Sequence, residues 1–260
     1  MNRLEKVFRD LKTKNEKAFV PYIMAGDGGL QALMERIVFL EKCGATAIEI
    51  GIPFSDPVAD GPTIQEAGIR ALEQGTTLKG VLDTLKDIRP IVAVPLIIMT
   101  YMNPIYAFGI HSFIENAAKS GVDALIIPDL PIEEEEIIAP EIERSRMELI
   151  RLATLTSSRE RIEAISNRGK GFLYAVTVTG ITGSRKEFQE GVGTYLQQLK
   201  SISPIPVLAG FGISTPDQVR EMTKYCDGVV VGSKIVQLLH EGKFSEVEIL
   251  IRESKMAEIS

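Results

Sequence analysis

Short apolar segments recur at similar spacing along the chain, and each is bounded by Gly, Pro or Asp. Near-continuous apolar runs are typical of strands that are covered on both faces, as in parallel sheets. We count eight of them: FVPYIMAG (Phe19–Gly26), AIEIGI (Ala47–Ile52), VPLIIMTY (Val94–Tyr101), ALIIPDL (Ala124–Leu130), ELIRLAT (Glu148–Thr154), FLYAVTV (Phe172–Val178), PVLAGF (Pro206–Phe211) and GVVVGS (Gly228–Ser233).

Segments with a helical period separate these strands. LQALMERIVFLEKCG has one apolar stripe and ends in a glycine cap at Gly44, and STPDQVREMTKYC opens with a capping Ser or Thr followed by Pro. Repeated strand–helix units predict an α/β protein, either a (β/α)8 barrel or an open doubly wound sheet. The even strand count and the length of 260 residues favour the barrel. Since no linker-like segment interrupts the pattern, we expect residues 1–260 to form a single TIM-barrel domain.

Composition limits the class of function. Hydrophobic residues make up 45% of the chain and charged residues 25%, which supports a sizeable core. The net charge of −6 argues against a nucleic-acid surface. No segment reaches the roughly 18 unbroken apolar residues of a membrane helix, and the charged N-terminus lacks a secretory apolar core, so we expect a cytoplasmic protein.

Cysteine and histidine usage predicts no metal site. Cys43 and Cys226 have no second Cys or His at ligand spacing, and we expect two buried, reduced thiols. His111 and His240 stand alone and are expected on the surface, near helix ends. The acidic run Glu133–Glu136 is expected to open a helix after Pro131, where negative charge suits the helix dipole.

Glycine-bearing loops follow the last three predicted strands, at the end of the barrel where sites of this fold lie. They are GITGSR (Gly180–Arg185), AGFGIS (Ala209–Ser214) and VGSKIV (Val231–Val236). Glycine lets backbone amides approach an anion, and a helix N-terminus adds unpaired donors, although the same glycines would also suit tight turns. We therefore predict a site for a phosphate monoester, formed mainly by backbone amides in these loops, at Gly183, Gly210, Phe211, Gly212, Ile213, Gly232 and Ser233.

Glu49 is the unusual residue of the second strand. Alternation places Ile48 and Ile50 on one face and Glu49 on the other, between the small residues Ala47 and Gly51, as suits an inward position near a ligand. The alternative is a buried ion pair, for which only Arg151 is a candidate. An unpaired carboxylate in apolar surroundings has its pKa raised, by up to roughly 3–5 units, and can then serve as a general acid.

Asp60 lies on the loop that follows this strand, in SDPVADGP. An Asx turn before Gly61 would by itself be enough to explain an aspartate at this position. However, Pro53, Pro57 and Pro62 stiffen the loop, and a stiff loop can present the carboxylate over the barrel mouth. One acid and one ionised base at opposite ends of a small substrate would move protons without a metal or cofactor. Tyr174 is expected to point inward, either hydrogen-bonded to one of these carboxyls or packed in the core.

Seven motifs follow one another along the chain, from Phe19 to past Ser233: PYIMAGD, IEIGIPFSDPVADGPTIQ, TYMNPI, GVDALIIPDLP, GITGSR, GFGIS and VGS. With these motifs in this order, the chain resembles the tryptophan synthase alpha subunit family. The resemblance implies a lyase that cleaves indole-3-glycerol phosphate to indole and glyceraldehyde 3-phosphate in tryptophan biosynthesis. It implies catalytic roles for Glu49 and Asp60, with Tyr174 orienting Glu49.

The same resemblance implies the rest of the site. Tyr22, Met99, Tyr101 and Ile126 would form an apolar slot for the indole ring, and GITGSRKEFQEGVG would be a mobile lid whose Thr182 reaches Asp60. No cofactor is expected in this chain, because pyridoxal phosphate would belong to a beta subunit in an alpha–beta heterotetramer. Pro53, Phe54, Asp56 and Pro131 are the expected contacts with that partner.

Other functions stay open at this point. A different phosphate-binding barrel enzyme, such as a sugar-phosphate isomerase, would share the glycine loops but has no need of the two-carboxylate segment. A non-catalytic regulator of a beta subunit would not need intact Glu49 and Asp60. A standalone lyase that releases free indole is compatible with every motif.

Overall fold

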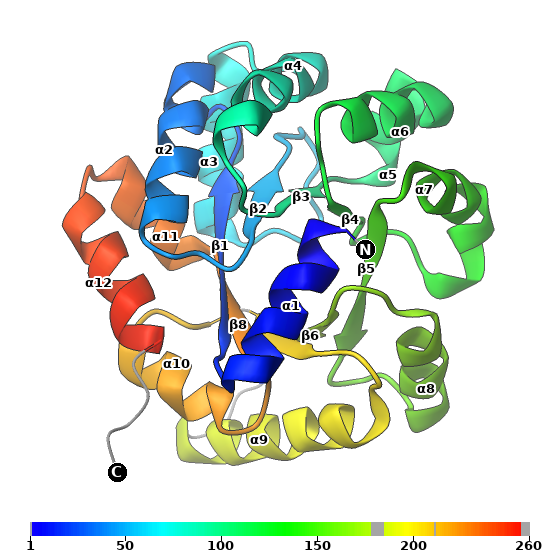
Figure 1. Ribbon diagram of the computed structural model, residues 1–260, viewed down its shortest axis with the longest axis vertical. Coiled ribbons are helices and arrows are strands. Elements are labelled where there is room, and N and C mark those ends of the chain that lie inside the picture. The colour runs from blue at the N-terminus through cyan, green and yellow to red at the C-terminus, as the bar shows by residue number, and fades with distance from the viewer. Residues whose placement is uncertain (1, 178–184, 211, 256–260) are drawn as a thin grey trace.

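Eight parallel strands close into a barrel in the computed structural model, which describes residues 2–177, 185–210 and 212–255 (Figure 1). The strands follow chain order, and β1 pairs with β8, which excludes the open doubly wound sheet. The predicted (β/α)8 barrel is therefore confirmed. The strands are β1 (Ala18–Met24), β2 (Ile48–Gly51), β3 (Leu96–Met99), β4 (Ala124–Ile126), β5 (Glu148–Thr154), β6 (Leu173–Val176), β7 (Val207–Gly210) and β8 (Gly228–Val231).

Helices surround the barrel and connect its strands (Figure 1). As expected, the apolar stripe of α2 is buried, and Gly44 takes a φ of +92° just after that helix. Thr215 is the residue that caps α10, in a capping box with Gln218. The helices are α1 (Arg3–Lys14), α2 (Leu30–Lys42), α3 (Pro62–Glu73), α4 (Leu78–Ile88), α5 (Met102–Phe108), α6 (Ile110–Lys119), α7 (Ala139–Ser145), α8 (Arg159–Arg168), α9 (Arg185–Ile202), α10 (Pro216–Thr223), α11 (Ser233–His240) and α12 (Phe244–Lys255), with 3₁₀ turns η1 (Arg89–Ile91) and η2 (Ile132–Ile137).

Alternation along the strands divides the core into two parts. Ile48 and Ile50 face outward and pack, with Ile37 of α2, in the layer between strands and helices. Inward-facing side chains such as Ile97 and Phe172 fill the barrel itself. The barrel interior is thus a packed core, and a ligand has room only at one of its two ends.

Helix α1 closes the end of the barrel at which the strands begin. Its buried Leu4, Phe8 and Leu11 belong to the same apolar cluster as the barrel interior, and the rings of Phe8 and Phe172 are 5.6 Å apart. Burying such side chains contributes about 1.5–3 kcal/mol each. The other end, where the strands finish, is therefore the one open to a ligand.

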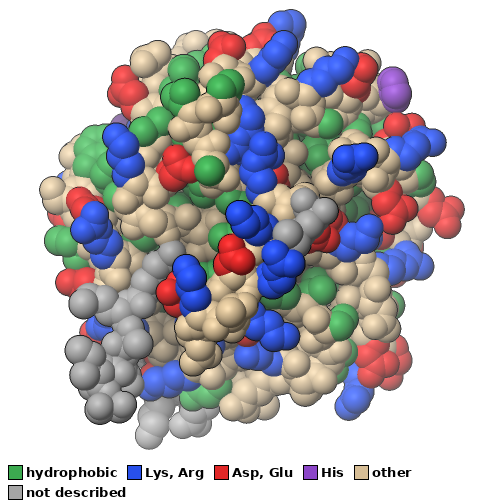
Figure 2. Space-filling view, in the orientation of Figure 1, with side chains coloured by type: hydrophobic (Ala, Val, Ile, Leu, Met, Phe, Trp, Pro, Cys, Tyr) green, Lys and Arg blue, Asp and Glu red, His purple; other side chains and the backbone are tan. Residues whose placement is uncertain are grey.

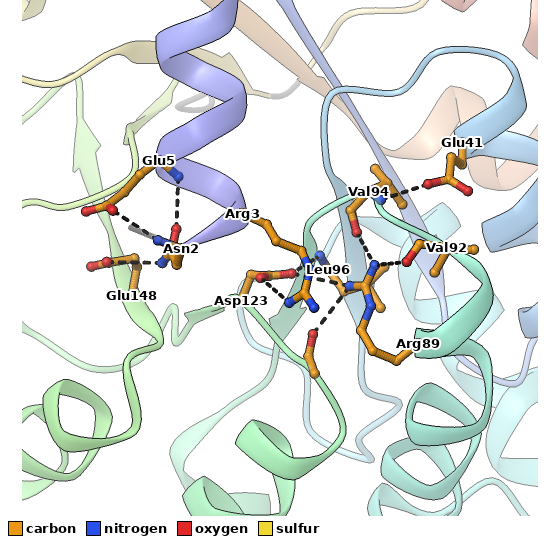
Figure 3. Close-up of polar contacts among 11 residues, drawn as sticks. Asn2, Arg3, Glu5, Glu41, Arg89, Val92, Val94, Leu96, Asp123 and Glu148 are labelled. Atoms are coloured by element: carbon orange, nitrogen blue, oxygen red, sulfur yellow. Dashed lines mark hydrogen bonds and ion pairs between the residues drawn. The ribbon is translucent and has the colours of Figure 1, made fainter.

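Polar contacts fasten α1 to the first residues of the strands (Figure 3). Arg3 Nη1 lies 3.1 Å from Asp123 Oδ1, and Asn2 Nδ2 donates to Glu148 Oε1 at 3.1 Å. The buried Asp123 also accepts from the Leu96 amide at 2.9 Å and pairs with Arg89 at 3.4 Å. In Figure 2, which shows this face, Lys and Arg side chains gather across its middle with acidic side chains among them.

Arg151, the one basic candidate for a pair with Glu49, points into the outer layer. Its Nε lies 2.6 Å from Glu135 Oε1. The run Glu133–Glu136 lies in the helical turn η2 directly after Pro131, as expected, and its buried Glu135 also neutralises Arg151. Glu133, which is exposed, pairs with Arg161 instead.

The predicted places of Cys and His are confirmed. Cys43 and Cys226 are buried and free. His111 is exposed at the start of α6, and His240 is exposed at the end of α11. Within residues 2–177, 185–210 and 212–255, no helix combines the length and apolar character needed to cross a bilayer.

Candidate active site

A cavity of about 300 Å³ opens at the end of the barrel where the strands finish. Five strands supply its floor through Tyr22, Glu49, Met99, Tyr174 and Val230, and the loops and helices that follow supply its walls. The wall residues are Asp60, Gly61, Thr63, Ile64, Gly212, Ile213, Ser214, Gly232, Ser233, Lys234 and Gln237. The cavity thus joins an acidic, tyrosine-lined part to a part built from glycine loops and the start of α11.

Glu49 points into this cavity from the middle of β2. It pairs in register with Tyr22 of β1 and Ile97 of β3, both of which face inward. Its side chain is 1% exposed, and its Oε2 has no hydrogen-bond partner. Among the described residues, Glu49 forms no ion pair. The ion-pair explanation of this glutamate is thereby excluded for that part of the chain.

The surroundings of Glu49 favour its neutral form. Burial is the main cause that raises its pKa to about 8, and the negative charge of Asp60 adds to the effect. Glu49 therefore carries a proton at neutral pH, which is the state required of a general acid.

Asp60 faces the same cavity from the loop between β2 and α3. Its own backbone amide donates to Pro57 at 3.1 Å, and its carbonyl accepts from Gln65 Nε2 at 2.8 Å, so both sides of the loop are tied down. Burial raises the pKa of Asp60 to about 6, and a hydrogen bond from Tyr101 opposes that rise. At neutral pH Asp60 is mostly ionised while Glu49 is mostly protonated. The two carboxyls are thus in the opposite states that an acid–base pair needs.

Two glycines make room for the tyrosines of the site. A Cβ on Gly51 would lie 1.9 Å from Tyr22 Oη, and a Cβ on Gly210 would lie 2.3 Å from the Tyr174 ring. Tyr22 and Tyr174 are both buried, and their pKa values are raised by burial first and then by the charges of Glu49 and Asp60. Tyr174 therefore points inward beside both carboxyls.

Only part of the expected indole slot lines the cavity. Tyr22 and Met99 do so. Ile126 is fully buried in the barrel core beneath, and Tyr101 lies behind Asp60 rather than at the cavity surface. We keep the slot as a prediction for Tyr22 and Met99 only.

The predicted phosphate loops lie at the other part of the cavity. Gly212, Ile213, Gly232 and Ser233 line it. The intrahelical hydrogen bonds of α11 begin with the Val236 amide and the Gly232 carbonyl, so the amides ahead of Val236 precede the first bonded turn. Such amides and the helix dipole suit a phosphate group.

Gly210 has a different place from the one predicted. It is not among the lining residues, and its missing side chain makes space for Tyr174 instead. Its carbonyl accepts from the Thr177 amide at 3.2 Å and from Thr177 Oγ1 at 2.5 Å. Gly183, Phe211 and Thr182, with the start of the expected lid, lie outside the described residues.

Sequence reasoning missed several residues of the cavity. The most notable are Lys234 and Gln237, which line it from one side of α11, one turn apart. Lys234 follows Ser233 directly. A lysine beside a glycine at the start of a helix is a pattern typical of phosphate sites, and this pattern could have predicted Lys234 as a site residue. Among the described residues, no group of three or more His, Cys, Asp or Glu side chains is placed to hold a metal ion.

Comparisons with known proteins agree with this geometry. The profile of the tryptophan synthase alpha chain family matches residues 8–259. A tryptophan synthase alpha chain from Bacillus cereus is 54% identical over 243 residues, which are 94% of each chain.

Solved structures agree as well. The tryptophan synthase subunit alpha of Legionella pneumophila superposes with a TM-score of 0.89 at 32% identity, over 98% of this chain and 97% of that one. A chain of the Mycobacterium tuberculosis tryptophan synthase in its ligand-free form does so with a TM-score of 0.87 at 31% identity, over 98% of both chains. The chain therefore belongs to the tryptophan synthase alpha chain family, which cleaves indole-3-glycerol phosphate in tryptophan biosynthesis and leaves pyridoxal phosphate to the beta subunit.

Proposed function

We propose that Glu49 is the proton donor and Asp60 the proton acceptor in the cleavage of indole-3-glycerol phosphate to indole and D-glyceraldehyde 3-phosphate. One observation supports this assignment. Glu49 is buried, has no cationic partner among the described residues, and faces the same cavity as Asp60. Their pKa values of about 8 and about 6 leave one carboxyl neutral and the other charged near pH 7.

The reaction is a retro-aldol cleavage with four proton transfers. Asp60 accepts the proton of the indole N1 while Glu49 delivers its proton to C3, and the ring becomes an electrophilic indolenine. The Glu49 carboxylate then takes the proton of the hydroxyl on the carbon attached to C3. The C–C bond breaks, its electron pair returns to the ring, the hydroxyl carbon becomes an aldehyde, and Asp60 returns the proton to N1. Tyr174 lies beside both carboxyls and would orient Glu49.

The two parts of the cavity suit the two ends of this substrate. Tyr22 and Met99 offer apolar surface beside the carboxyls for the ring. Gly212, Ile213, Gly232 and Ser233 would hold the phosphate mainly through backbone amides, and the half-buried Lys234 would add a positive charge. Binding the phosphate at one end aligns the reacting carbon with the acid and base at the other.

Replacement of Glu49 by Gln tests the assignment, because Gln has nearly the same shape but no acidic proton. We expect Glu49→Gln to abolish release of indole, a loss of at least about 10²–10⁴-fold for one acid–base group. Glu148→Gln is the matched control, since Glu148 is also a buried strand glutamate but lies at the closed end of the barrel. Turnover of Glu49→Gln close to that of the unaltered chain would refute the role.

We further propose that the chain works with a beta subunit in an alpha–beta heterotetramer. Solved relatives bear the name of the whole tryptophan synthase, as in the Mycobacterium tuberculosis structure. Asp56, on the loop that carries Asp60, and Pro131, after β4, are both exposed, as a contact with a partner requires. Pro53 is buried and Phe54 is half-buried against Tyr101, so these two expected contacts face inward instead.

Size-exclusion chromatography with and without the cognate beta subunit tests this assembly. Co-elution as a heterotetramer supports it, whereas separate elution together with release of free indole would favour the standalone lyase. The two buried free thiols suit a reducing compartment, and we propose a cytoplasmic location for the single domain of residues 1–260.

A further inference from the structure

We propose that Tyr101 is the positioning residue of Asp60: its hydroxyl holds the Asp60 carboxylate toward the substrate cavity, and its ring anchors the loop that carries this carboxylate. The inference rests on the proposed role of Asp60 as proton acceptor. It replaces the expectation that Tyr101 is a wall of the indole slot.

The hydroxyl of Tyr101 lies at the end of the loop. The amide of Ala59 donates to Tyr101 Oη at 3.0 Å, and this contact places the hydroxyl next to the Asp60 carboxyl, whose pKa it lowers. A tyrosine hydroxyl has one hydrogen to donate. Because Oη accepts from Ala59, its single hydrogen is free to point at Asp60. The donor therefore favours the ionised form of Asp60 and one direction of its side chain.

The ring of Tyr101 contacts the beginning of the same loop. Its centroid lies 5.6 Å from that of Phe54, with the two planes at 36°. One side chain thus touches both Phe54 near the start of the loop and Ala59 and Asp60 near its end. The prolines in this loop stiffen its backbone, but they do not orient the Asp60 carboxyl group itself, and the Tyr101 hydroxyl supplies that restraint.

Tyr101 is itself held firmly. It is 3% exposed and stands directly before α5. The amide of the next residue, Met102, donates to both carboxylate oxygens of Asp129, at 3.0 and 3.2 Å. Since Asp129 comes from the loop after β4, the position of Tyr101 is fixed from a neighbouring strand and not only by its own. A buried and restrained donor loses little entropy when it orients a catalytic group.

The contact has a definite effect on ionisation. The groups that face Asp60 are Glu49, Tyr22, Tyr174 and Tyr101, and Asp129 lies beside Tyr101. Burial raises the pKa of Asp60, and Tyr101 is the neighbour that lowers it. Removing the hydroxyl therefore moves the protonation of Asp60 to higher pH, and the acid side of the activity profile moves with it.

Tyr101→Phe tests the proposal, because Phe keeps the ring and its contact with Phe54 but removes the hydroxyl. Indole release is measured from pH 5 to 9 with the chain alone and with the beta subunit added. We expect kcat to fall about 10–100-fold, the range for a hydrogen bond to a charged group, with KM changed less than about threefold. The acid limb of kcat/KM should rise by about half a pH unit or more.

Two variants separate positioning from a structural effect. Tyr106→Phe, on the exposed neighbouring tyrosine of α5, should leave kcat and the pH profile unchanged. Phe54→Leu loosens the ring contact but keeps the hydroxyl, so it should lower kcat less than Tyr101→Phe and leave the acid limb in place. Thermal unfolding of each variant shows that the barrel is folded.

The outcomes distinguish this inference from the proposed function. If Asp60→Asn cleaves the substrate at the normal rate, the role of Asp60 fails, and that of Tyr101 with it. If Asp60→Asn is inactive while Tyr101→Phe has normal kcat and an unmoved acid limb, only the positioning role is overturned. A rise in KM alone would assign Tyr101 to the slot and would also overturn it.

Discussion

At the scale of single residues, the site depends on one glutamate that the fold buries and that has no cationic partner in the part of the chain that the structure describes. Strand alternation offered Arg151 as a basic partner for Glu49, but Arg151 points outward and pairs with Glu135. The charged group that acts on Glu49 is therefore Asp60. Desolvation and this like charge act in the same direction on Glu49. Asp60 is the stronger acid in this cavity because it is less buried than Glu49, and Tyr101 lowers its pKa further.

These ionisation states predict a bell-shaped dependence of kcat/KM on pH. Activity requires Asp60 to be ionised, which occurs above a pH of about 6, and Glu49 to be protonated, which occurs below a pH of about 8. We expect a maximum between these limits and a loss on both sides. Initial rates of indole release across the pH range measure it. A rate that keeps rising above pH 9 would contradict the assignment of Glu49 as the acid.

Gly51 should be intolerant of a methyl group. A Cβ there meets the Tyr22 hydroxyl at 1.9 Å, so Gly51→Ala must displace the tyrosine from the floor of the cavity. We expect kcat/KM to fall at least tenfold and the free energy of unfolding to fall by about 1–3 kcal/mol, as for overpacking. Steady-state kinetics and urea unfolding measure both.

Gly68→Ala is the control for this substitution. Gly68 lies in α3 and does not line the cavity, and a Cβ there meets only Met24 Cε, at an ordinary contact distance of 3.6 Å. Ala should therefore raise stability by up to about 1 kcal/mol and leave kcat/KM unchanged. Equal behaviour of the two alanine variants would show that the contact with Tyr22 is not what matters.

At the scale of elements, α1 and α11 have opposite tasks at opposite ends of the barrel. Helix α1 closes the starting ends of the strands through its apolar face and the contacts of Arg3 and Asn2 (Figure 3). Helix α11 begins at the cavity and presents Ser233, Lys234 and Gln237 to it. One helix thus contributes stability and the other contributes binding.

Asp123 should matter far more for stability than the Arg3 that fastens α1 to it. Asp123→Ala leaves Arg89, whose side chain is 10% exposed, without its carboxylate, and the Leu96 amide without its acceptor. We expect a loss of about 3–5 kcal/mol, as for a buried pair with one partner removed. Arg3 is half exposed, so Arg3→Ala should cost no more than about 1 kcal/mol. Urea unfolding of both variants gives the comparison, and similar losses would contradict it.

Lys234→Ala should weaken substrate binding without changing the rate of the chemical step. Its position one turn before Gln237 on the cavity side of α11 suits the phosphate end. We expect KM to rise about three- to tenfold with kcat nearly constant, because the lost attraction acts on bound substrate and transition state alike. Lys243→Ala, beyond the end of α11, is the control. A fall in kcat alone would place Lys234 in the chemical step.

At the scale of the whole molecule, the two ends of the barrel divide stability from assembly. The end closed by α1 carries mixed charges (Figure 2), whereas the loop after β2 at the other end exposes Asp56 and Val58, the latter 84% exposed. This loop carries Asp60 as well. A partner that binds the loop would therefore act directly on the position of the proposed base.

Asp56→Ala should weaken the complex with the beta subunit and spare the cleavage activity of the free chain. Asp56 is exposed, and it does not line the cavity. We expect at least tenfold weaker association by titration calorimetry. Asp10→Ala, an exposed aspartate on α1 at the other end, should associate normally. Equal affinities of the two variants would place the partner elsewhere.

Much of the fold was predictable because its signals are local. The eight apolar runs, the cap at Gly44 and the Thr215–Pro216 helix start depend on neighbours within a few residues. The predicted runs extend up to four residues beyond the ends of the strands, as at Ala124–Leu130, because the first loop residues, such as Ile127 and Pro128, are apolar as well. The alternation of side chains along a strand was sufficient to predict that Glu49 points inward. A shift of the strand by one residue would have placed Ile48 and Ile50 inside the barrel instead.

The sequence by itself determined the barrel, the family and the inward direction of Glu49, since each depends on periodicity or on a contiguous motif. Only the tertiary structure decided that Gly210 makes room for Tyr174, that the Tyr101 hydroxyl accepts from Ala59 beside Asp60, and that Lys234 lines the cavity. Each of these facts depends on groups from different strands, loops or helices. Such contacts form only when barrel closure brings those elements together, and no local pattern records their distances.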